Sequence, residues 1–142
     1  MEKIFGAAHV FVENDIDTDL IIAANFLTTF DKKILAQHAL ESLRPNFAAQ
    51  ISPGDFLVAG KNFGCGSSRE HAVWALQAAG IAGVIAENFA RIFLRNSKNN
   101  DFFTFSLENA PQKFSQNDKI EIDFSAKKIK NLTQKTEFSF EN

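Results

Sequence analysis

Residues 63–72, FGCGSSREHA, place two adjacent serines and an arginine directly behind a glycine-rich turn. A helix that begins at such a turn has unpaired N–H groups and about half a positive charge at its start, so it can bind an anion or stabilise an alkoxide. Arg69 adds a planar set of donors that suits a carboxylate. The stretch therefore predicts a site for a dicarboxylate at Ser67 and Arg69.

The same residues also have a purely structural interpretation. Ser67 and Glu70 have the S-x-x-E spacing of a capping box, in which both side chains satisfy N–H groups at the start of a helix and nothing reacts. The residues alone leave both interpretations open.

Other reactive motifs do not fit this turn. No Gly-Lys-Ser/Thr follows Gly66, which excludes a phosphate-binding P-loop. Arg69 stands where a dinucleotide fingerprint needs its third glycine, and where a hydrolase elbow built on Ser67 needs its last glycine. Cys65 and His71 are separated by the turn itself, which disfavours a pair of thiolate and imidazole.

The acidic stretch DIDTD, residues 15–19, resembles the start of a calcium loop. Such a loop needs glycine at its sixth position and glutamate at its twelfth, where this chain has Leu20 and Phe26. The aspartates are therefore expected in turns or helix caps. Asp19, which adjoins an apolar segment, is the best candidate among them for a role at the site.

The composition narrows the classes of function. A chain of 142 residues that is 45% hydrophobic and 23% charged is typical of one soluble globular domain. Its net charge of -2 gives no general attraction to nucleic acid.

No apolar run approaches ~18 residues and the first residues do not form a leader pattern, so we expect no membrane partner and a cytoplasmic location. The one cysteine, Cys65, cannot hold zinc or an iron–sulfur cluster alone, so any cluster must belong to another chain.

Alternating strands and helices must position these residues. Apolar periodicity and glycine or proline punctuation predict helices over residues 31–43, about 68–79 and 88–97, the first capped by Asp31 and the second ending at Gly80. Strands are expected at residues 4–12, 19–24, 54–60, 81–87, 102–107, 118–124, 127–132 and 136–140. Because no linker divides the mixed first part from the strand-rich end, the sequence predicts one α/β domain over residues 1–142.

Three blocks of the sequence carry a family resemblance. They are NDIDTDLIIAANFL, GKNFGCGSSREHAVWALQAAGIAGVIAENFARIFLRN and the pair NN at residues 99 and 100. Together they resemble the small subunits of 3-isopropylmalate dehydratase (isopropylmalate isomerase), which have the swivelling β/β/α domain of the aconitase superfamily. The resemblance covers about residues 5–105.

The resemblance implies a hydro-lyase of leucine biosynthesis made of two chains. A large subunit would hold a [4Fe-4S] cluster with three of its own cysteines, and this chain would bind no cofactor and close over the cluster as a lid. Ser67 matches the catalytic base of the family, while Ser68 and Arg69 match residues that bind a substrate carboxylate. Asp19 matches a position that orients the site, and His71 is expected to make a structural hydrogen bond.

In such enzymes the choice of substrate is associated with the loop after DTDLII. Here that loop has Phe26, Leu27, Thr28 and Thr29. Subunits of the homoaconitase type have an arginine at the position of Thr28, which holds a third carboxylate. A threonine hydroxyl cannot replace that charge, so the resemblance favours a dicarboxylate with an apolar branch, such as isopropylmalate or the smaller methylmalate.

Three departures keep alternatives open. The chain ends at Asn142, short of the final helix of many relatives, so its docking surface for the large subunit is expected to differ. Phe26 replaces the usual tyrosine, and Asp101 stands where the family commonly has glycine, at a turn expected to need a positive φ. A subunit of the methylmalate or homoaconitase type is the alternative within the same chemistry. A non-catalytic module that binds dicarboxylates is the alternative from another class.

Overall fold

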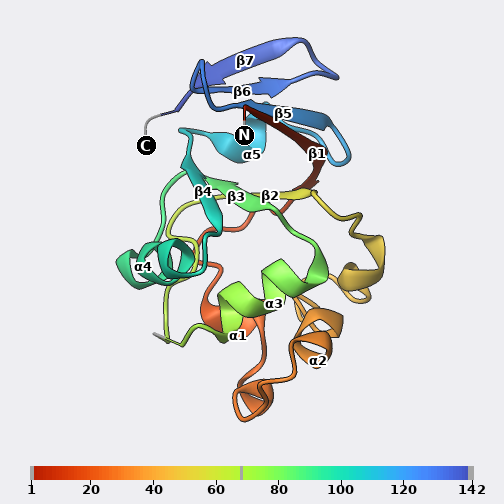
Figure 1. Ribbon diagram of the computed structural model, residues 1–142, viewed down its shortest axis with the longest axis vertical. Coiled ribbons are helices and arrows are strands. Elements are labelled where there is room, and N and C mark those ends of the chain that lie inside the picture. Colours follow the sequence, from red (N-terminus) through yellow and green to blue (C-terminus); the bar gives the residue numbers. More distant parts are fainter. Residues whose placement is uncertain (1, 68, 141–142) are drawn as a thin grey trace.

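The computed structural model describes residues 2–67 and 69–140, and its strands form one curled sheet (Figure 1). Within these residues seven strands lie in the order β4-β3-β2-β1-β5-β6-β7. They are β1 (Lys3–Val10), β2 (Phe56–Ala59), β3 (Gly83–Ala86), β4 (Phe103–Ser106), β5 (Lys119–Asp123), β6 (Lys128–Asn131) and β7 (Thr136–Ser139). The helices are α1 (Thr18–Ile21), α2 (Lys32–Gln37), α3 (His71–Ala79), α4 (Arg91–Asn99) and α5 (Ala110–Lys113), with 3-10 turns η1 (Ala24–Phe26) and η2 (Phe47–Gln50). The predicted α/β class is confirmed.

Strand β1 belongs to both halves of the sheet. Its residues 8–10 pair in parallel with β2, and its residues 3–7 pair antiparallel with β5. Parallel pairing continues through β3 and β4, and antiparallel pairing continues through β6 and β7. Gly6 lies against the backbone of Gly54 near the change of partner, where a Cβ atom would overlap the Gly54 carbonyl group. The absence of a side chain at Gly6 therefore lets the two segments approach.

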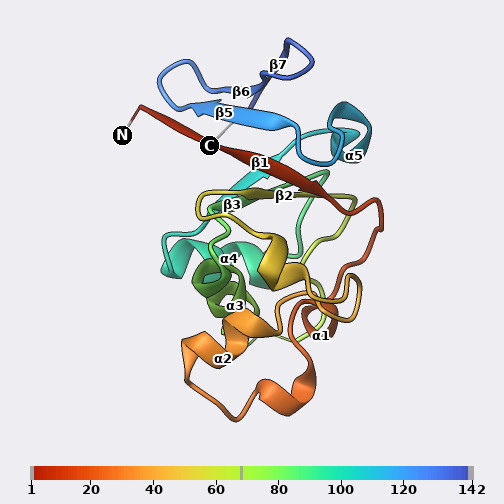
Figure 2. The same ribbon diagram turned by 90° about the vertical axis from the view of Figure 1, so that its right-hand side faces the viewer.

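Two apolar cores lie on opposite faces of the parallel strands. In β2, Leu57 and Ala59 belong to one core, whereas Phe56 and Val58 belong to the other, because successive side chains of a strand point to opposite faces. Helices α1 to α4 cover the first core, and the second lies between the parallel strands, α5 and the curled-over strands β5 to β7 (Figures 1 and 2). Burial on both faces explains why β2 is apolar throughout.

Two predicted helix ends are confirmed, namely the start of α2 at Asp31 and the end of α3 at Gly80. Gly80 follows α3 with φ at 107°, and Asp31 caps α2 by accepting a hydrogen bond from the Lys33 N–H group at 3.0 Å. Helix α2 is shorter than predicted, because the chain turns away from helical geometry at Leu40, whose φ is 54°. The Leu40 N–H group donates to the Ile21 carbonyl at 2.8 Å, a tertiary bond that replaces the bond of a continued helix.

The predicted extended segment over residues 19–24 is wrong, because residues 18–21 form α1. The Asp17 carboxylate caps this helix by accepting from the Leu20 N–H group at 3.0 Å. Ile21 and Ile22 are both buried. The run is therefore apolar because this short helix is buried in the core, and not because it forms a strand. Such a run is ambiguous in sequence, since a buried turn and a buried strand produce the same composition.

The remaining helices differ from expectation in extent. Helix α4 begins at Arg91, three residues into the predicted span, and the four-residue helix α5 was not predicted. Asp101 has φ at 54°, which confirms the expected positive φ at that turn. No helix among residues 2–67 and 69–140 is both long enough and apolar enough to cross a membrane.

A buried pair, His9 and Asp55, joins β1 to the turn before β2. His9 Nε2 lies 2.7 Å from Asp55 Oδ2, and His9 Nδ1 lies 2.9 Å from Gln116 Nε2. Gln116 Oε1 accepts from the Val10 N–H group at 2.8 Å, which fixes the orientation of the amide. Because an amide nitrogen only donates, His9 Nδ1 accepts, and the proton on Nε2 is donated to Asp55.

The Asp55 carboxylate predicts a pH dependence of stability. Burial by itself raises the pKa of Asp55, but hydrogen bonds from Ser52 N–H, His9 and Ala7 N–H outweigh burial, and the pKa lies below its ordinary value. A carboxyl with a lowered pKa in the folded state contributes stability that is complete above its unfolded pKa of about 4 and is lost as the pH falls through the folded pKa.

We expect Asp55→Asn to reduce the free energy of unfolding by about 1–3 kcal/mol near neutral pH, because it disturbs a buried network of hydrogen bonds. Denaturant titrations of both proteins should show this difference shrinking below about pH 4. Glu137→Gln, which alters an ion pair with Lys128 at the surface, is the control and should change stability little. A difference that stays constant down to about pH 3 would contradict the assigned role of the carboxylate.

Candidate active site

The loop that carries Ser67 leaves the carboxyl end of β2, the side of a parallel sheet where ligands commonly bind. Gly64 and Gly66 have φ at 81° and 101°, which favours glycine at both positions. A Cβ atom on Gly64 would overlap the Phe93 ring, and one on Gly66 would lie 3.2 Å from Thr18 Oγ1. The two glycines thus form a tight turn and also leave room for Thr18 of α1 and Phe93 of α4.

A second segment, Ile16–Thr18, holds this turn in place. The Gly64 N–H group donates to the Ile16 carbonyl at 2.8 Å, and the Thr18 N–H group donates to the Cys65 carbonyl at 2.8 Å. The Ser67 N–H group donates to the Thr18 hydroxyl at 2.9 Å. Three hydrogen bonds therefore fix the backbone on which Ser67 sits.

The Ser67 hydroxyl lies at a half-buried position next to an exposed arginine. Its oxygen accepts a hydrogen bond from the Arg69 N–H group at 3.3 Å. No ion pair within the described residues engages the Arg69 guanidinium, so its donors are available to a carboxylate. Ser68, the other residue predicted to bind a carboxylate, lies outside the described residues.

The capping-box interpretation of Ser67 and Glu70 is wrong. Helix α3 begins at His71, and Glu70 occupies the cap position without a capping bond from its side chain. The Glu70 carboxylate accepts instead from Asn100 Nδ2 at 2.6 Å. Local spacing favoured a bond to the helix start, but a residue from the end of α4 competes for the same carboxylate.

Asn100 joins the start of α3 to the end of α4. Besides Glu70, its amide nitrogen donates to the Asn96 carbonyl at 2.8 Å, and its amide oxygen accepts from Trp74 Nε1 at 3.1 Å. Sequence reasoning assigned no role to Asn100 or to Thr18. Both lie inside the blocks that carried the family resemblance, but only the tertiary structure shows what their side chains contact.

The predicted specificity loop, Phe26–Thr29, lies against the first residue of α3. His71 Nε2 lies 3.0 Å from the Thr29 carbonyl oxygen, so His71 makes the structural hydrogen bond expected of it. The Phe26 ring stacks on His38 with ring centroids 4.2 Å apart. Thr28 is exposed, whereas Phe26, Leu27 and Thr29 are half-buried. The structure thus joins the loop to the helix that follows Ser67.

Asp19 and Cys65 occupy different environments beside the turn. Asp19 is exposed in the first turn of α1, next to the Thr18 that holds Ser67. Burial raises the pKa of the Cys65 thiol, and the nearby carboxylates of Asp17 and Asp15 raise it further. A thiol with a raised pKa is a poor nucleophile and a poor metal ligand. No group of three His, Cys, Asp or Glu side chains in the described parts of the chain is placed to hold a metal ion.

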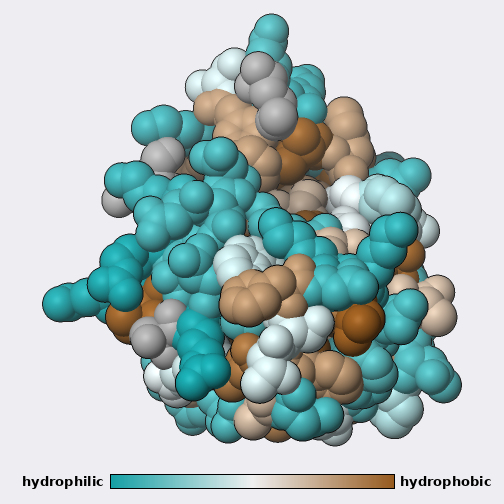
Figure 3. Space-filling view, turned by 60° about the horizontal axis from the view of Figure 1, so that its bottom comes forward, coloured by the Kyte–Doolittle hydropathy of each residue, from teal (hydrophilic) through white to brown (hydrophobic). Residues whose placement is uncertain are grey.

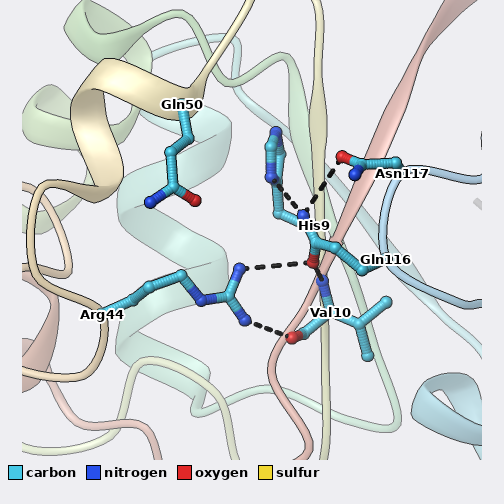
Figure 4. Close-up of a pocket in the computed structure, with 6 residues that line it drawn as sticks. All are labelled: His9, Val10, Arg44, Gln50, Gln116 and Asn117. Atoms are coloured by element: carbon cyan, nitrogen blue, oxygen red, sulfur yellow. Dashed lines mark hydrogen bonds between the residues drawn. The ribbon is translucent and has the colours of Figure 1, made fainter.

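A pocket of about 490 Å³ lies elsewhere, at the carboxyl end of β1 (Figure 4). Its lining residues are His9, Val10, Arg44, Gln50, Gln116 and Asn117. The Arg44 guanidinium donates to the Val10 carbonyl at 2.6 Å and to Gln116 Oε1 at 3.3 Å, and it lies over the Phe11 ring at 4.0 Å. These internal contacts occupy the one cation of the pocket, so we assign the candidate site to the Ser67 turn.

The end of the molecule that carries α1, α2 and α3 has a mixed surface. Figure 3 brings this end forward and shows hydrophilic side chains interrupted by separate apolar patches. A hydroxyl on a rigid turn, a neighbouring guanidinium and a half-exposed loop together suit a small carboxylate substrate. The arrangement provides a candidate base and a carboxylate binder.

Comparisons with known proteins identify the family to which the chain is similar. A model of the aconitase C-terminal domain matches residues 46–110. The 3-isopropylmalate dehydratase small subunit of Wolinella succinogenes is 48% identical over 135 residues, which cover 95% of this chain and 80% of that protein. The 3-isopropylmalate dehydratase small subunit of Caldicellulosiruptor bescii is 49% identical over 133 residues, which cover 94% of this chain and 80% of that protein.

Two solved structures are similar in fold. A crystal structure of 3-isopropylmalate dehydratase from Methanocaldococcus jannaschii superimposes with a TM-score of 0.92 at 40% identity, and the match covers 98% of this chain and 81% of that chain. Aconitase X of Thermococcus kodakaraensis gives a TM-score of 0.54 at 13% identity, with 99% of this chain and 91% of that chain covered. The second similarity concerns the fold alone.

The hydrogen bond from Ser67 N–H to Thr18 yields a test of how the turn is held. We expect Thr18→Val to lower the free energy of unfolding by about 1–3 kcal/mol, because it leaves the Ser67 N–H group without its acceptor. Hydrogen exchange at the Ser67 amide should accelerate in this variant. Thr18→Ser keeps the hydroxyl and should retain slow exchange; equal exchange in the two variants would show that the hydroxyl does not hold the turn.

Proposed function

The chain belongs to the family of 3-isopropylmalate dehydratase small subunits, and on that premise we propose that Ser67 is the catalytic base of a two-chain hydro-lyase. The enzyme interconverts 2-isopropylmalate and 3-isopropylmalate by removing and re-adding water, a step of leucine biosynthesis. The observation that carries the proposal is the Ser67 hydroxyl, half-exposed on a turn that Thr18 holds and beside Arg69, whose guanidinium makes no ion pair with the residues that the structure describes.

Ser67 would remove the proton from the carbon next to a substrate carboxylate. A hydroxyl resists ionisation about as strongly as bulk water does, so the site must stabilise the alkoxide. The Arg69 N–H group already donates to Ser67 Oγ at 3.3 Å, and such a bond strengthens as negative charge develops on the oxygen. The Arg69 guanidinium adds a positive charge close by.

The neighbouring residues would bind and orient the substrate. Arg69 and Ser68 would bind one carboxylate, and Asp19 would orient the site from α1 without contacting the reacting carbon. Residues Phe26, Leu27, Thr28 and Thr29 would face the substrate branch. The loop contains no cation, which supports a dicarboxylate with an apolar branch over a tricarboxylate.

The chain would work with a large subunit that carries a [4Fe-4S] cluster. A single cysteine, half-buried and with a raised thiol pKa, does not fit a cluster-binding site on this chain, which supports placing the cluster on the partner. The cluster would supply the Lewis acid for the departing hydroxyl. Phe30 and Ile34, which are 75% and 39% exposed near the loop, offer apolar surface for the partner to cover. The predicted cytoplasmic location is part of the same proposal.

Replacement of Ser67 tests the base. We expect Ser67→Ala, reconstituted anaerobically with a large subunit that carries the cluster, to lose about 10²- to 10⁴-fold in kcat, because proton removal loses its acceptor. Turnover is followed by the ultraviolet absorbance of the unsaturated intermediate. Ser106→Ala, on the edge strand β4, is the matched control and should keep wild-type turnover. Wild-type kcat in Ser67→Ala would exclude Ser67 as the base.

Replacement of Thr28 tests the loop. We expect Thr28→Arg to reduce kcat/KM for isopropylmalate about 10-fold or more, because a guanidinium placed against the apolar branch of a bound substrate would lose water without gaining a charged partner. Steady-state kinetics of the reconstituted pair measure the change, with Thr133→Arg, outside the loop, as the control. Unchanged kinetics in Thr28→Arg would show that the loop does not contact the substrate branch.

A further inference from the structure

His71 occupies a junction between the two parts of the candidate site. It is the first residue of α3, directly after the Ser67–Glu70 stretch, and only 7% of it is exposed. Its Nε2 atom lies 3.0 Å from the Thr29 carbonyl oxygen, and Thr29 ends the predicted specificity loop. One side chain therefore connects the helix that follows the base to the loop that would contact the substrate branch.

The contact with the Thr29 carbonyl determines which nitrogen of the His71 ring carries the proton. A carbonyl oxygen only accepts, so Nε2 carries the proton and donates it to Thr29. His71 Nδ1 is buried and has no hydrogen-bond partner among residues 2–67 and 69–140. The Nε2 proton is therefore engaged by the loop carbonyl, which gives His71 a structural contact to the loop.

Aromatic rings hold the His71 ring in this orientation. The Trp74 ring centroid lies 4.9 Å from that of His71, and the Phe30 ring centroid lies 5.7 Å away on the loop side. Lys32 Nζ in turn lies 5.5 Å from the Trp74 ring. This packing restricts rotation of the His71 ring and keeps its Nε2–H group directed at the loop.

The other hydrogen bonds of the loop are local. The Thr29 N–H group donates to the Phe26 carbonyl at 3.2 Å, and the Asp31 N–H group donates to Thr29 Oγ1 at 3.1 Å. These bonds shape the loop itself and join it to α2. Within the described residues, the bond from His71 is the one hydrogen bond that joins residues 26–30 to α3.

We propose that His71 is a positioning residue that fixes the specificity loop relative to Ser67 by holding the Thr29 carbonyl. The proposal rests on the proposed function, because it assigns the loop a substrate to discriminate. Without the bond, the loop shifts relative to the base, and a small misplacement of a contacting group weakens discrimination. The expected effect falls on substrate selectivity and KM and spares the chemical step.

The first experiment uses the full chain without a partner. Hydrogen exchange of the segment 26–31 is compared in wild type, His71→Leu and His71→Gln. We expect exchange to rise about 5-fold in His71→Leu, which removes a bond of typical net strength, and to stay near wild type in His71→Gln, whose amide can donate at the same place. Gln77→Leu is the matched control, since it removes a bond from α3 to the Asn100 carbonyl and should leave this segment unchanged.

The second experiment uses the reconstituted pair of subunits. The ratio of kcat/KM for isopropylmalate to kcat/KM for methylmalate should fall about 5-fold in His71→Leu, mainly through KM, and recover in His71→Gln. Should His71→Leu not fold, His71→Asn takes its place, because its shorter amide does not reach Thr29. Unchanged loop exchange, or loosened exchange with an unchanged ratio, overturns the proposal. A wild-type pair that turns over neither substrate overturns the proposed function instead, while loop exchange still decides whether His71 holds the loop.

Discussion

The hydrogen bonds between the Ile16–Thr18 segment and the Gly64–Ser67 turn are the constraint on which the candidate site depends. A turn with two glycines in left-handed geometry has little stiffness of its own, because glycine adopts many conformations. Three bonds from a segment distant in the sequence remove that freedom. Capping of α1 by Asp17 orders the same segment, so the segment that holds the serine turn is itself fixed by a helix.

Ser67, Glu70 and His71 are held from three directions. Thr18 fixes the turn, Asn100 holds Glu70 from the end of α4, and Thr29 accepts from His71. Each contact joins side chain to backbone or side chain to side chain across distant segments, and none is part of regular secondary structure. A candidate site assembled in this way has fixed surroundings, while the Arg69 guanidinium makes no ion pair within the described residues.

Much of the scaffold could be predicted from sequence, because its signals are local. Two-sided burial produces apolar strands such as β2, and Gly80 ends α3 through a conformation that suits glycine. The serine turn was also identified from spacing. The partner of Glu70 and the role of Thr18 were not, because both depend on contacts between distant segments. The family resemblance indicated the candidate site residues, and the structure shows which contacts hold Ser67, Glu70 and His71.

The division of β1 between two sheet halves has a consequence for how the chain reaches its native state. The parallel half needs only the first three quarters of the sequence, whereas β1 pairs Ile4 with Ile122 in the antiparallel half. Contacts between such distant residues close long loops and form slowly. During synthesis on the ribosome, the core between the two halves therefore remains exposed to solvent until the last strands emerge, and apolar surface exposed in this way favours aggregation.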